Sequence, residues 1–306
     1  MQFGLGHRAL TRLSMHDLML FSLTGVIFCW VVSRYVTGPL AKLNAAAASI
    51  AQGYLSTRVD PSVRNRKDEI ADLADSFDEM AERIEALVNG QRRLLSDVSH
   101  ELRSPLSRLT VAIGLLKQGP SDDSAEYLER IALEAHRLNT MIGQLLALTR
   151  LDSGVDGSDL QQFDLTNLVQ EVASDGDFEA RARNRSVVIR QADPCSLKGY
   201  EEPIRSAVEN LIRNAIRYTA EAMSVEVSIE VQGSSAMIRI RDFGPGVPDA
   251  FIPEIFVPFR RASNSYSDGA GLGLAIAERA VHLHRGKIRA MNAAGGGLVV
   301  EIYLPI

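Results

Sequence analysis

One contiguous segment pairs an imidazole with a carboxylate: residues 94–106 read LLSDVSHELRSPL. Its apolar side chains recur at steps of three and four, which predicts an amphipathic helix. At 3.6 residues per turn, His100 lies about 200° from Val98 and Leu102, so it should face solvent. Glu101 can hold one ring nitrogen or take its proton, which leaves the other nitrogen free as a nucleophile. An ordinary surface histidine is the alternative.

A later segment, residues 209–218, reads ENLIRNAIRY. Asn210, Asn214 and Arg217 share one helix face in it, because they are spaced by four and three residues. Amide oxygens suit a hydrated Mg²⁺, and a guanidinium suits phosphate. A solvated polar helix face is the alternative for this group.

Two glycine-containing segments complete a candidate nucleotide site. Residues 241–247, RDFGPGV, end a predicted strand, where Asp242 can accept a hydrogen bond from an exocyclic amine. A simple tight turn is the alternative. Residues 268–276, DGAGLGLAI, lead into a helix whose first N–H groups can approach phosphate oxygens. A dinucleotide-binding fingerprint is not expected, since no strand directly precedes this loop, and a Walker motif would need Lys followed by Ser or Thr.

Periodicity predicts the elements that must position these groups. Helices are expected over residues 124–152, 167–183 and 201–217, and strands over 225–231 and 236–241. From residue 163 the pattern indicates an α+β layer, with helices on one face of a largely antiparallel sheet. Before it, two long antiparallel helices bury their apolar faces well only in a four-helix bundle made by two chains, which predicts a homodimer.

The N-terminal part differs in character. Residues 18–36, LMLFSLTGVIFCWVVSRYV, are apolar apart from Arg34 and are long enough to cross a bilayer. A membrane span is therefore expected; a signal peptide and a buried core helix are the alternatives, but no small-residue cleavage site follows. Gly38 and Pro39 should end this helix and start another. Two heptad-like runs then follow, which should pair in a parallel bundle with a second chain or else form an amphipathic hairpin.

Composition excludes several classes of protein. The 306-residue chain is 46% hydrophobic and 23% charged, which is typical of a folded protein of two or three modules. A net charge of -5 without a basic stripe argues against direct nucleic-acid binding. Cys29 and Cys195 are the only cysteines, and they offer neither a disulfide framework nor a Cys-rich metal site.

Taken together, the segments resemble a known family of signalling proteins. Residues 94–149 look like the dimerisation and phosphoacceptor domain of HisKA sensor kinases, and the run beginning Asp68-Glu69-Ile70 is similar to the HAMP relay domain. The last part resembles the catalytic domain that histidine kinases share with gyrase, Hsp90 and MutL. Across its length the chain is most like the Cpx-type envelope-stress sensors of Gram-negative bacteria. The resemblance implies a multidomain order: tail 1–17, transmembrane helix 18–37, HAMP domain 38–90, all-α dimerisation and histidine phosphotransfer domain 91–152, linker 153–162 and α+β ATP-binding domain 163–306.

The resemblance implies a transmembrane sensor histidine kinase that phosphorylates His100 from Mg-ATP and passes the phosphoryl group to an aspartate of a cognate response regulator. Glu101 would be the acid/base partner of His100. Ser104, where the family usually has Thr or Asn, would position water for a reverse phosphatase reaction. Asn214 would be the main Mg²⁺ ligand, with Asn210 as a second. The remaining residues implied at the nucleotide are Arg217, Tyr218, Asp242 as the adenine reader, Gly244, Gly246, Arg261, Gly269, Gly271, Leu272 and Gly273.

Asn210 also favours transfer of the phosphoryl group to His100 over hydrolysis of ATP. Hydrolysing relatives place a water-activating Glu at this position, whereas an amide cannot act as a general base, so ATP should survive until His100 attacks. An ATPase coupled to conformational change and a nucleotide-binding scaffold are the alternatives. The implied location is the bacterial inner membrane, with the catalytic modules in the cytoplasm. Such sensors usually carry a first membrane helix and a periplasmic domain, so the chain is expected to be a fragment or to sense through the span and relay alone.

Overall fold

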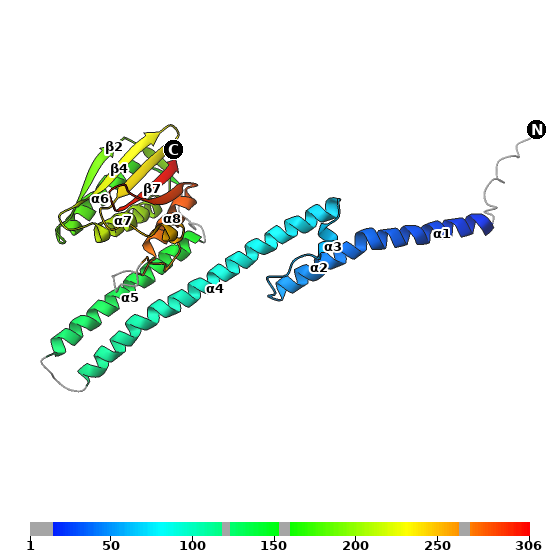
Figure 1. Ribbon diagram of the computed structural model, residues 1–306, viewed down its shortest axis with the longest axis horizontal. Helices are drawn as coiled ribbons and strands as arrows, with labels where there is room; N and C mark the ends of the chain where they lie inside the picture. Colours follow the sequence, from blue (N-terminus) through cyan, green and yellow to red (C-terminus); the bar gives the residue numbers. More distant parts are fainter. Residues whose placement is uncertain (1–14, 118–122, 153–159, 263–269) are drawn as a thin grey trace, which may run out of the picture. The chain divides into compact units, whose positions relative to one another are not determined.

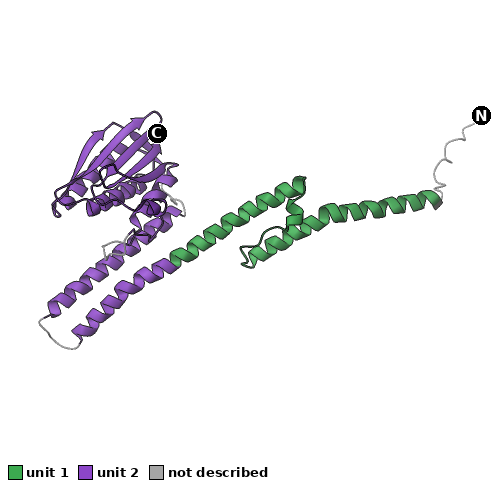
Figure 2. Cartoon of the chain, in the orientation of Figure 1, with its two compact units in different colours: residues 1–95 green, residues 96–306 purple. Residues whose placement is uncertain are grey.

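The computed structural model describes residues 15–117, 123–152, 160–262 and 270–306. The chain divides into two compact units, residues 1–95 and 96–306, which Figure 2 distinguishes by colour. Most of the predicted tail and linker lies outside the described residues, and so does the break between the two helices of the phosphoacceptor region.

The first unit begins with an apolar helix. α1 (Met15–Val32) continues through a π-helical turn, η1 (Ser33–Thr37), into α2 (Gly38–Ala51). By length and composition, residues 16–51 are the one candidate membrane span in the described part of the chain, and large side chains such as Phe21 are exposed. The helix end expected at Gly38 is wrong. The N–H of Gly38 bonds the carbonyl oxygen of Ser33 five residues back, and this wider turn carries the helix past Pro39.

A short connector joins the helices of the first unit. α3 (Pro61–Arg64) is capped by Asp60, whose Oδ1 accepts a hydrogen bond from the N–H of Ser62 at 2.8 Å. A small core forms between the helices and the connector, made of Leu43, Ala46, Val59, Val63 and Ala74. Two helices with a connector and a small shared core agree with the relay module expected after the apolar segment.

Two long helices carry the segment around His100. α4 (Glu69–Leu116) runs without interruption through His100 and Pro105, and α5 (Ser124–Asp152) confirms the second predicted helix. Within the second unit the two helices lie side by side (Figure 1). Arg108 of α4 donates hydrogen bonds to both carboxylate oxygens of Glu134 of α5, each at 2.8 Å.

The rest of the second unit is an α+β domain. A five-stranded sheet has the order β2-β4-β5-β7-β6, in which only the β2–β4 pair is parallel. Its strands are β2 (Ser186–Ala192), β4 (Ser224–Gln232), β5 (Ser235–Arg241), β6 (Lys287–Asn292) and β7 (Leu298–Pro305). A separate antiparallel pair joins β1 (Gln161–Asp164) to β3 (Ser196–Gly199). The predicted, largely antiparallel sheet is confirmed.

Three helices cover one face of the large sheet (Figure 1). They are α6 (Leu165–Arg181), α7 (Glu201–Tyr218) and α8 (Gly273–Leu283), and a 3-10 turn, η2 (Asp249–Glu254), precedes α8. In α7, residues Ile204, Val208, Leu211 and Ile212 are buried in the core. Burying this apolar stripe fixes the rotation of α7, so the polar side chains at other phases of the helix must face away from the core.

His284 is a buried polar group that fastens α8 to the smaller sheet. Its Nδ1 lies 2.7 Å from the carbonyl oxygen of Ala280, and its Nε2 accepts a hydrogen bond from the N–H of Tyr200 at 2.8 Å. Burial lowers the pKa of His284. Because the folded pKa lies below that of the unfolded chain, this stabilisation is complete above about pH 6.5 and is lost as the pH falls below it.

We therefore expect the melting temperature of the full chain in detergent micelles to fall as the pH is lowered from about 7 to about 5. The contribution of His284 is at most about 1.4 kcal/mol per pH unit. His284→Gln should flatten this dependence, whereas His282→Gln, two residues earlier on the exposed side of α8, should not. Calorimetry across this pH range checks the prediction, and equal slopes for the parent and both variants would contradict it.

Candidate active site

Residues 94–106 show the helix phase that their sequence predicts. His100 is exposed on α4, while Val98 and Leu102 are half-buried. Ser104 follows one turn after His100 and is also exposed, whereas Pro105 is buried. The imidazole is therefore accessible to a reactant from solvent.

Glu101 contacts a residue that is distant in sequence. Nη2 of Arg261 lies 3.2 Å from Oε1 and 3.4 Å from Oε2 of this carboxylate. Both side chains are about one-third exposed, so solvent screens the pair and it adds little stability. The Glu101–Arg261 pair matters for position, because it brings the segment after η2 to the carboxylate beside His100. A second ion pair, between Arg279 of α8 and Asp152 at the end of α5, spans 3.0 Å.

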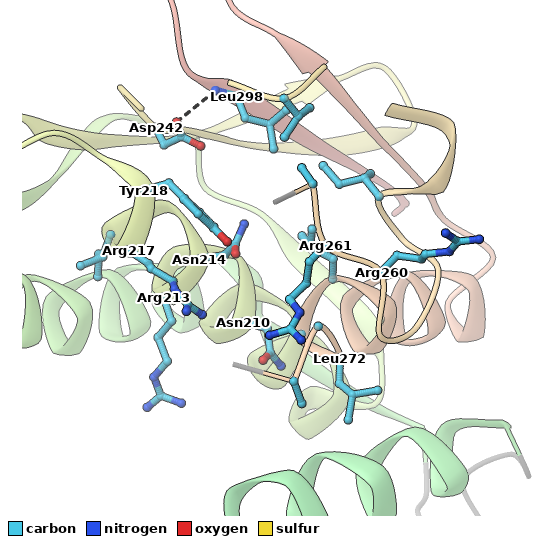
Figure 3. A pocket seen from close by; sticks show the side chains of 18 of the residues that line it. Asn210, Arg213, Asn214, Arg217, Tyr218, Asp242, Arg260, Arg261, Leu272 and Leu298 are labelled. Atoms are coloured by element: carbon cyan, nitrogen blue, oxygen red, sulfur yellow. Dashed lines mark hydrogen bonds between the residues drawn. The ribbon is translucent and has the colours of Figure 1, made fainter. Parts of the chain in front are cut away.

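A cavity of about 760 Å³ lies among α7, the loop after β5 and the start of α8 (Figure 3). This volume suits a nucleotide-sized ligand. Its walls include ten of the residues that the sequence indicates: Asn210, Asn214, Arg217, Tyr218, Asp242, Gly246, Arg261, Gly271, Leu272 and Gly273. Gly244 does not line the cavity, and Gly269 falls outside the described residues.

Asp242 is a carboxylate in the wall of the cavity, held there by backbone groups. It is 4% exposed, and its Oδ1 accepts hydrogen bonds from the N–H of Gly244 at 2.9 Å and of Leu298 at 3.1 Å. Burial raises the pKa of Asp242, and these two hydrogen bonds oppose the rise. Figure 3 shows the carboxylate at the top of the cavity, with Arg260 and Arg261 to the right. A buried acid with a perturbed pKa in a cleft is typical of a binding site.

Glycines bring the backbone close to Asp242. A Cβ on Gly244 would collide with the carbonyl oxygen of Tyr218, so Gly244 lets the loop rest on the end of α7 although it does not line the cavity. A Cβ on Gly297 would collide with the carbonyl oxygen of Asp242, and the φ of Gly297 is +87°. The sequence reasoning missed Gly297 and Leu298. The run of glycines at 295–297, just before the last strand, was the available signal.

The arginine of α7 fits a bound anion. Nη2 of Arg217 is buried, yet it has no hydrogen-bond partner among the residues that the structure describes. An unpaired buried donor is costly, and a phosphate oxygen would satisfy it. Arg213 and Arg260 line the same cavity, so cationic side chains reach it from two elements.

The amides of α7 fit a Mg²⁺ ion that arrives with phosphates. Nδ2 of Asn210 donates to the carbonyl oxygen of Ser206 at 2.8 Å, which leaves Oδ1 for other contacts. Asn214 lines the cavity one turn later. In the described part of the chain, no group of three or more His, Cys, Asp or Glu side chains is arranged to hold a metal. Two amide oxygens suffice where phosphates and water supply the remaining Mg²⁺ ligands.

The helix α5 also contributes to the cavity, through Thr140 and Gln144. Neither residue was predicted, because nothing local in α5 signals that the α+β domain packs beside it. This packing places the candidate nucleotide site in the same compact unit as His100.

Three family models match the chain. Residues 31–86 match the HAMP domain, residues 90–154 match the His Kinase A (phospho-acceptor) domain, and residues 199–306 match the histidine kinase-, DNA gyrase B- and HSP90-like ATPase domain. The matches follow one another in the order that the sequence predicts.

Curated relatives agree with the family models. The sensor histidine kinase CpxA of Escherichia coli (strain K12) is 38% identical over 272 residues, which cover 88% of this chain and 58% of CpxA. The sensor protein PfeS of Pseudomonas aeruginosa is 31% identical over 273 residues, which cover 89% of this chain and 60% of PfeS. The chain thus spans about three-fifths of the length of these relatives. Histidine kinase ThkA, solved in complex with the response regulator protein TrrA, has the same fold, with a TM-score of 0.59, 22% identity and coverage of 78% of this chain and 68% of that chain.

Proposed function

This chain belongs to the sensor histidine kinases with HAMP, HisKA and HATPase_c domains, and we propose that it phosphorylates its own His100 from Mg-ATP and then passes the phosphoryl group to an aspartate of a response regulator. One observation carries the proposal. The nucleotide-sized cavity and the exposed imidazole lie in one compact unit, where Arg261 both lines the cavity and touches the carboxylate next to His100.

The transfer uses groups that lie in one compact unit of the chain. A ring nitrogen of His100 forms a bond to the γ-phosphorus, the bond from that phosphorus to the bridging oxygen breaks, and ADP leaves with the electron pair. Glu101 takes or holds the proton of the other ring nitrogen. Arg217 and Arg261 offset the charge on the transferring group. Mg²⁺, held by Asn214 and Asn210, would neutralise phosphate charge when bound.

The Glu101–Arg261 pair must open for this reaction. In the structure the Glu101 carboxylate contacts the Arg261 guanidinium, which also borders the cavity. While this pair is formed, Glu101 is not available to the His100 imidazole and Arg261 is not available to the phosphates. Movement of the α+β domain along α5 would free Glu101 for the imidazole and Arg261 for the phosphates. We propose that the pair marks a resting arrangement of the kinase.

Two rivals make different use of the same cavity. An ATPase would need a general base beside the γ-phosphate, but Asn210 offers only an amide, which is bonded to Ser206. A scaffold would bind nucleotide without chemistry, and it would have no need for an exposed His100 beside a carboxylate. Both rivals therefore fit the residues less well than the kinase does.

The helices α4 and α5 leave a wide apolar surface in the single chain. Large side chains are at least 48% exposed at Leu106, Val111, Leu128, Ile142 and Leu146. Exposed apolar surface of this kind is typical of a site where a partner binds. We propose that a second copy completes a four-helix bundle, which makes the kinase a homodimer.

Location and further partners follow from the same assignment. We propose that the transmembrane helix predicted over residues 18–37, within the apolar helix, anchors the chain in a bacterial inner membrane, with the modules that follow in the cytoplasm. The partner is a response regulator that docks on α4 and α5, and not nucleic acid. Ser104, exposed one turn after His100, would direct water at the phosphorylated regulator in a reverse phosphatase reaction.

The deciding experiment gives γ-labelled ATP and Mg²⁺ to the full chain in detergent micelles. The kinase should retain a label that acid releases and base does not, should pass it to a receiver domain, and should acquire no label when EDTA is present from the start. Steady ATP hydrolysis without a retained label would identify the ATPase. Nucleotide binding with neither product would identify the scaffold.

Replacing Glu101 tests its role separately from nucleotide binding. We expect Glu101→Gln to slow autophosphorylation by about 10²- to 10³-fold at saturating ATP, because an amide cannot accept the imidazole proton. The affinity for ATP should stay within about twofold, since the Glu101–Arg261 pair is exposed and weak. Single-turnover labelling measures the rate, and titration with a fluorescent ATP analogue measures affinity. Loss of affinity with an unchanged rate would contradict the assigned role.

A further inference from the structure

A buried polar cluster joins α4 to α5 beside the phosphoacceptor. Nε and Nη2 of Arg108 donate to the two carboxylate oxygens of Glu134, each at 2.8 Å, and Nη1 of Arg137 donates to Oε1 at 3.0 Å. Glu134 is only 2% exposed. Two guanidinium groups thus compensate one buried carboxylate, and the bidentate pair fixes the plane of Arg108.

The remaining nitrogen of Arg108 reaches Ser104. Its Nη1 donates a hydrogen bond to the Ser104 Oγ at 2.6 Å. A serine hydroxyl can accept this bond and still donate its own proton. Ser104 is exposed, so a water molecule or a group that docks on α4 can reach its hydroxyl. The hydrogen bond from Arg108 holds the Oγ in one position, with its proton available as a donor.

This arrangement matters because Ser104 is a serine. Threonine has a branched Cβ that restricts its χ1 angle, whereas serine rotates more freely. A hydroxyl on a freely rotating side chain is seldom aimed at a reacting water. The fixed guanidinium of Arg108 supplies the restriction that the missing methyl group does not.

We infer that Arg108, held by Glu134, is a positioning residue for dephosphorylation of the response regulator, because it holds the Ser104 hydroxyl as a donor to the attacking water. The inference rests on the phosphatase reaction in the proposed function. In this step the water oxygen forms a bond to the phosphorus of the aspartyl phosphate, and the bond from phosphorus to the carboxylate oxygen breaks. The carboxylate leaves with the electron pair, and the proton lost by water passes to solvent. Ser104 occupies one lone pair of the water, so the other is aimed at phosphorus.

A double-mutant cycle tests this inference. The probe is a receiver domain that the parent phosphorylates, purified in its phosphorylated form and mixed with the full chain and ADP in micelles. We expect Ser104→Ala and Arg108→Gln each to slow release of inorganic phosphate by about tenfold. The two changes combined should slow it no further, because Arg108 acts through Ser104. Autophosphorylation of Arg108→Gln should change much less than its dephosphorylation rate.

Two further variants separate positioning from stability. Arg137→Gln removes a guanidinium from the same carboxylate without touching Ser104, so its dephosphorylation rate should match the parent. Arg108→Gln leaves Glu134 with less charge compensation and can impair folding. Combining it with Glu134→Gln removes the buried charge, and this protein should melt near the parent temperature while remaining slow in dephosphorylation.

The outcomes are distinct. A parent that releases no phosphate would overturn the proposed phosphatase and the inference together. If the parent releases phosphate and Ser104→Ala is unimpaired, the phosphatase stands, but the role of Ser104 and the inference fail. If Ser104→Ala is slow but Arg108→Gln is not, the phosphatase stands and the inference fails. Additive losses, or an equal loss in Arg137→Gln, would assign Arg108 a purely structural role.

Discussion

His100→Gln is expected to reduce the retained label from γ-labelled ATP to less than about one-thousandth of the parent level, because the glutamine amide is not a nucleophile and cannot replace the imidazole. Glutamine has a similar size and keeps polar atoms on the exposed face of α4, so the fold should be unaffected. ATP affinity should remain at the parent value, since His100 does not line the nucleotide cavity. Scintillation counting of the protein and an independent ATP titration measure the two quantities.

The matched control is His136→Gln. His136 is also an exposed histidine on a long helix of the same unit, but it has no carboxylate directly beside it in sequence. This variant should label as the parent does. Retention of label in His100→Gln, or its loss in His136→Gln, would move the phosphoacceptor to another residue.

Helix phase is the part of this site that the sequence predicts well. The positions of His100 on α4 and of Asn210, Asn214 and Arg217 on α7 follow from apolar periodicity, because burial of one stripe determines where every other side chain points. The elements around them were predicted for the same reason. Part of the sheet could also be predicted, since apolar and polar residues alternate in β4 and β5 and these two strands are neighbours in the chain that pair with each other.

Contacts between distant segments were not predicted. Nothing in residues 94–106 indicates that Arg261 reaches Glu101, and nothing near Glu134 indicates that Arg108 does, because long-range ion pairs leave no local pattern. Likewise, the N–H that Leu298 donates to Asp242 comes from 56 residues later in the chain. The joined helix at Gly38 was missed because a π turn tolerates a Gly-Pro sequence that would ordinarily end a helix.

Asp242→Asn is expected to weaken ATP binding by about 100-fold or more and to remove autophosphorylation at ordinary ATP concentrations. The N–H groups of Gly244 and Leu298 both donate to Oδ1, so the substituted amide must keep its oxygen there. Its NH₂ group then takes the position of the second carboxylate oxygen. A donor would face the exocyclic amine of adenine, which is also a donor, so the base loses an acceptor and meets repulsion.

Although Asp242→Asn should weaken ATP binding, it should not lower the stability of the folded protein. Burial raises the pKa of Asp242, which means that the folded protein without nucleotide disfavours the charged carboxylate. The folded pKa is above the unfolded one, so the parent gains stability as the pH falls through that range, and the uncharged Asn variant should not. At neutral pH the variant should melt at or above the parent temperature. The control is Glu301→Gln, a buried acid of β7 outside the cavity, which should bind ATP normally. An Asp242→Asn protein that binds ATP as the parent does, or loses ATP only because it has unfolded, would show that this carboxylate does not read the base.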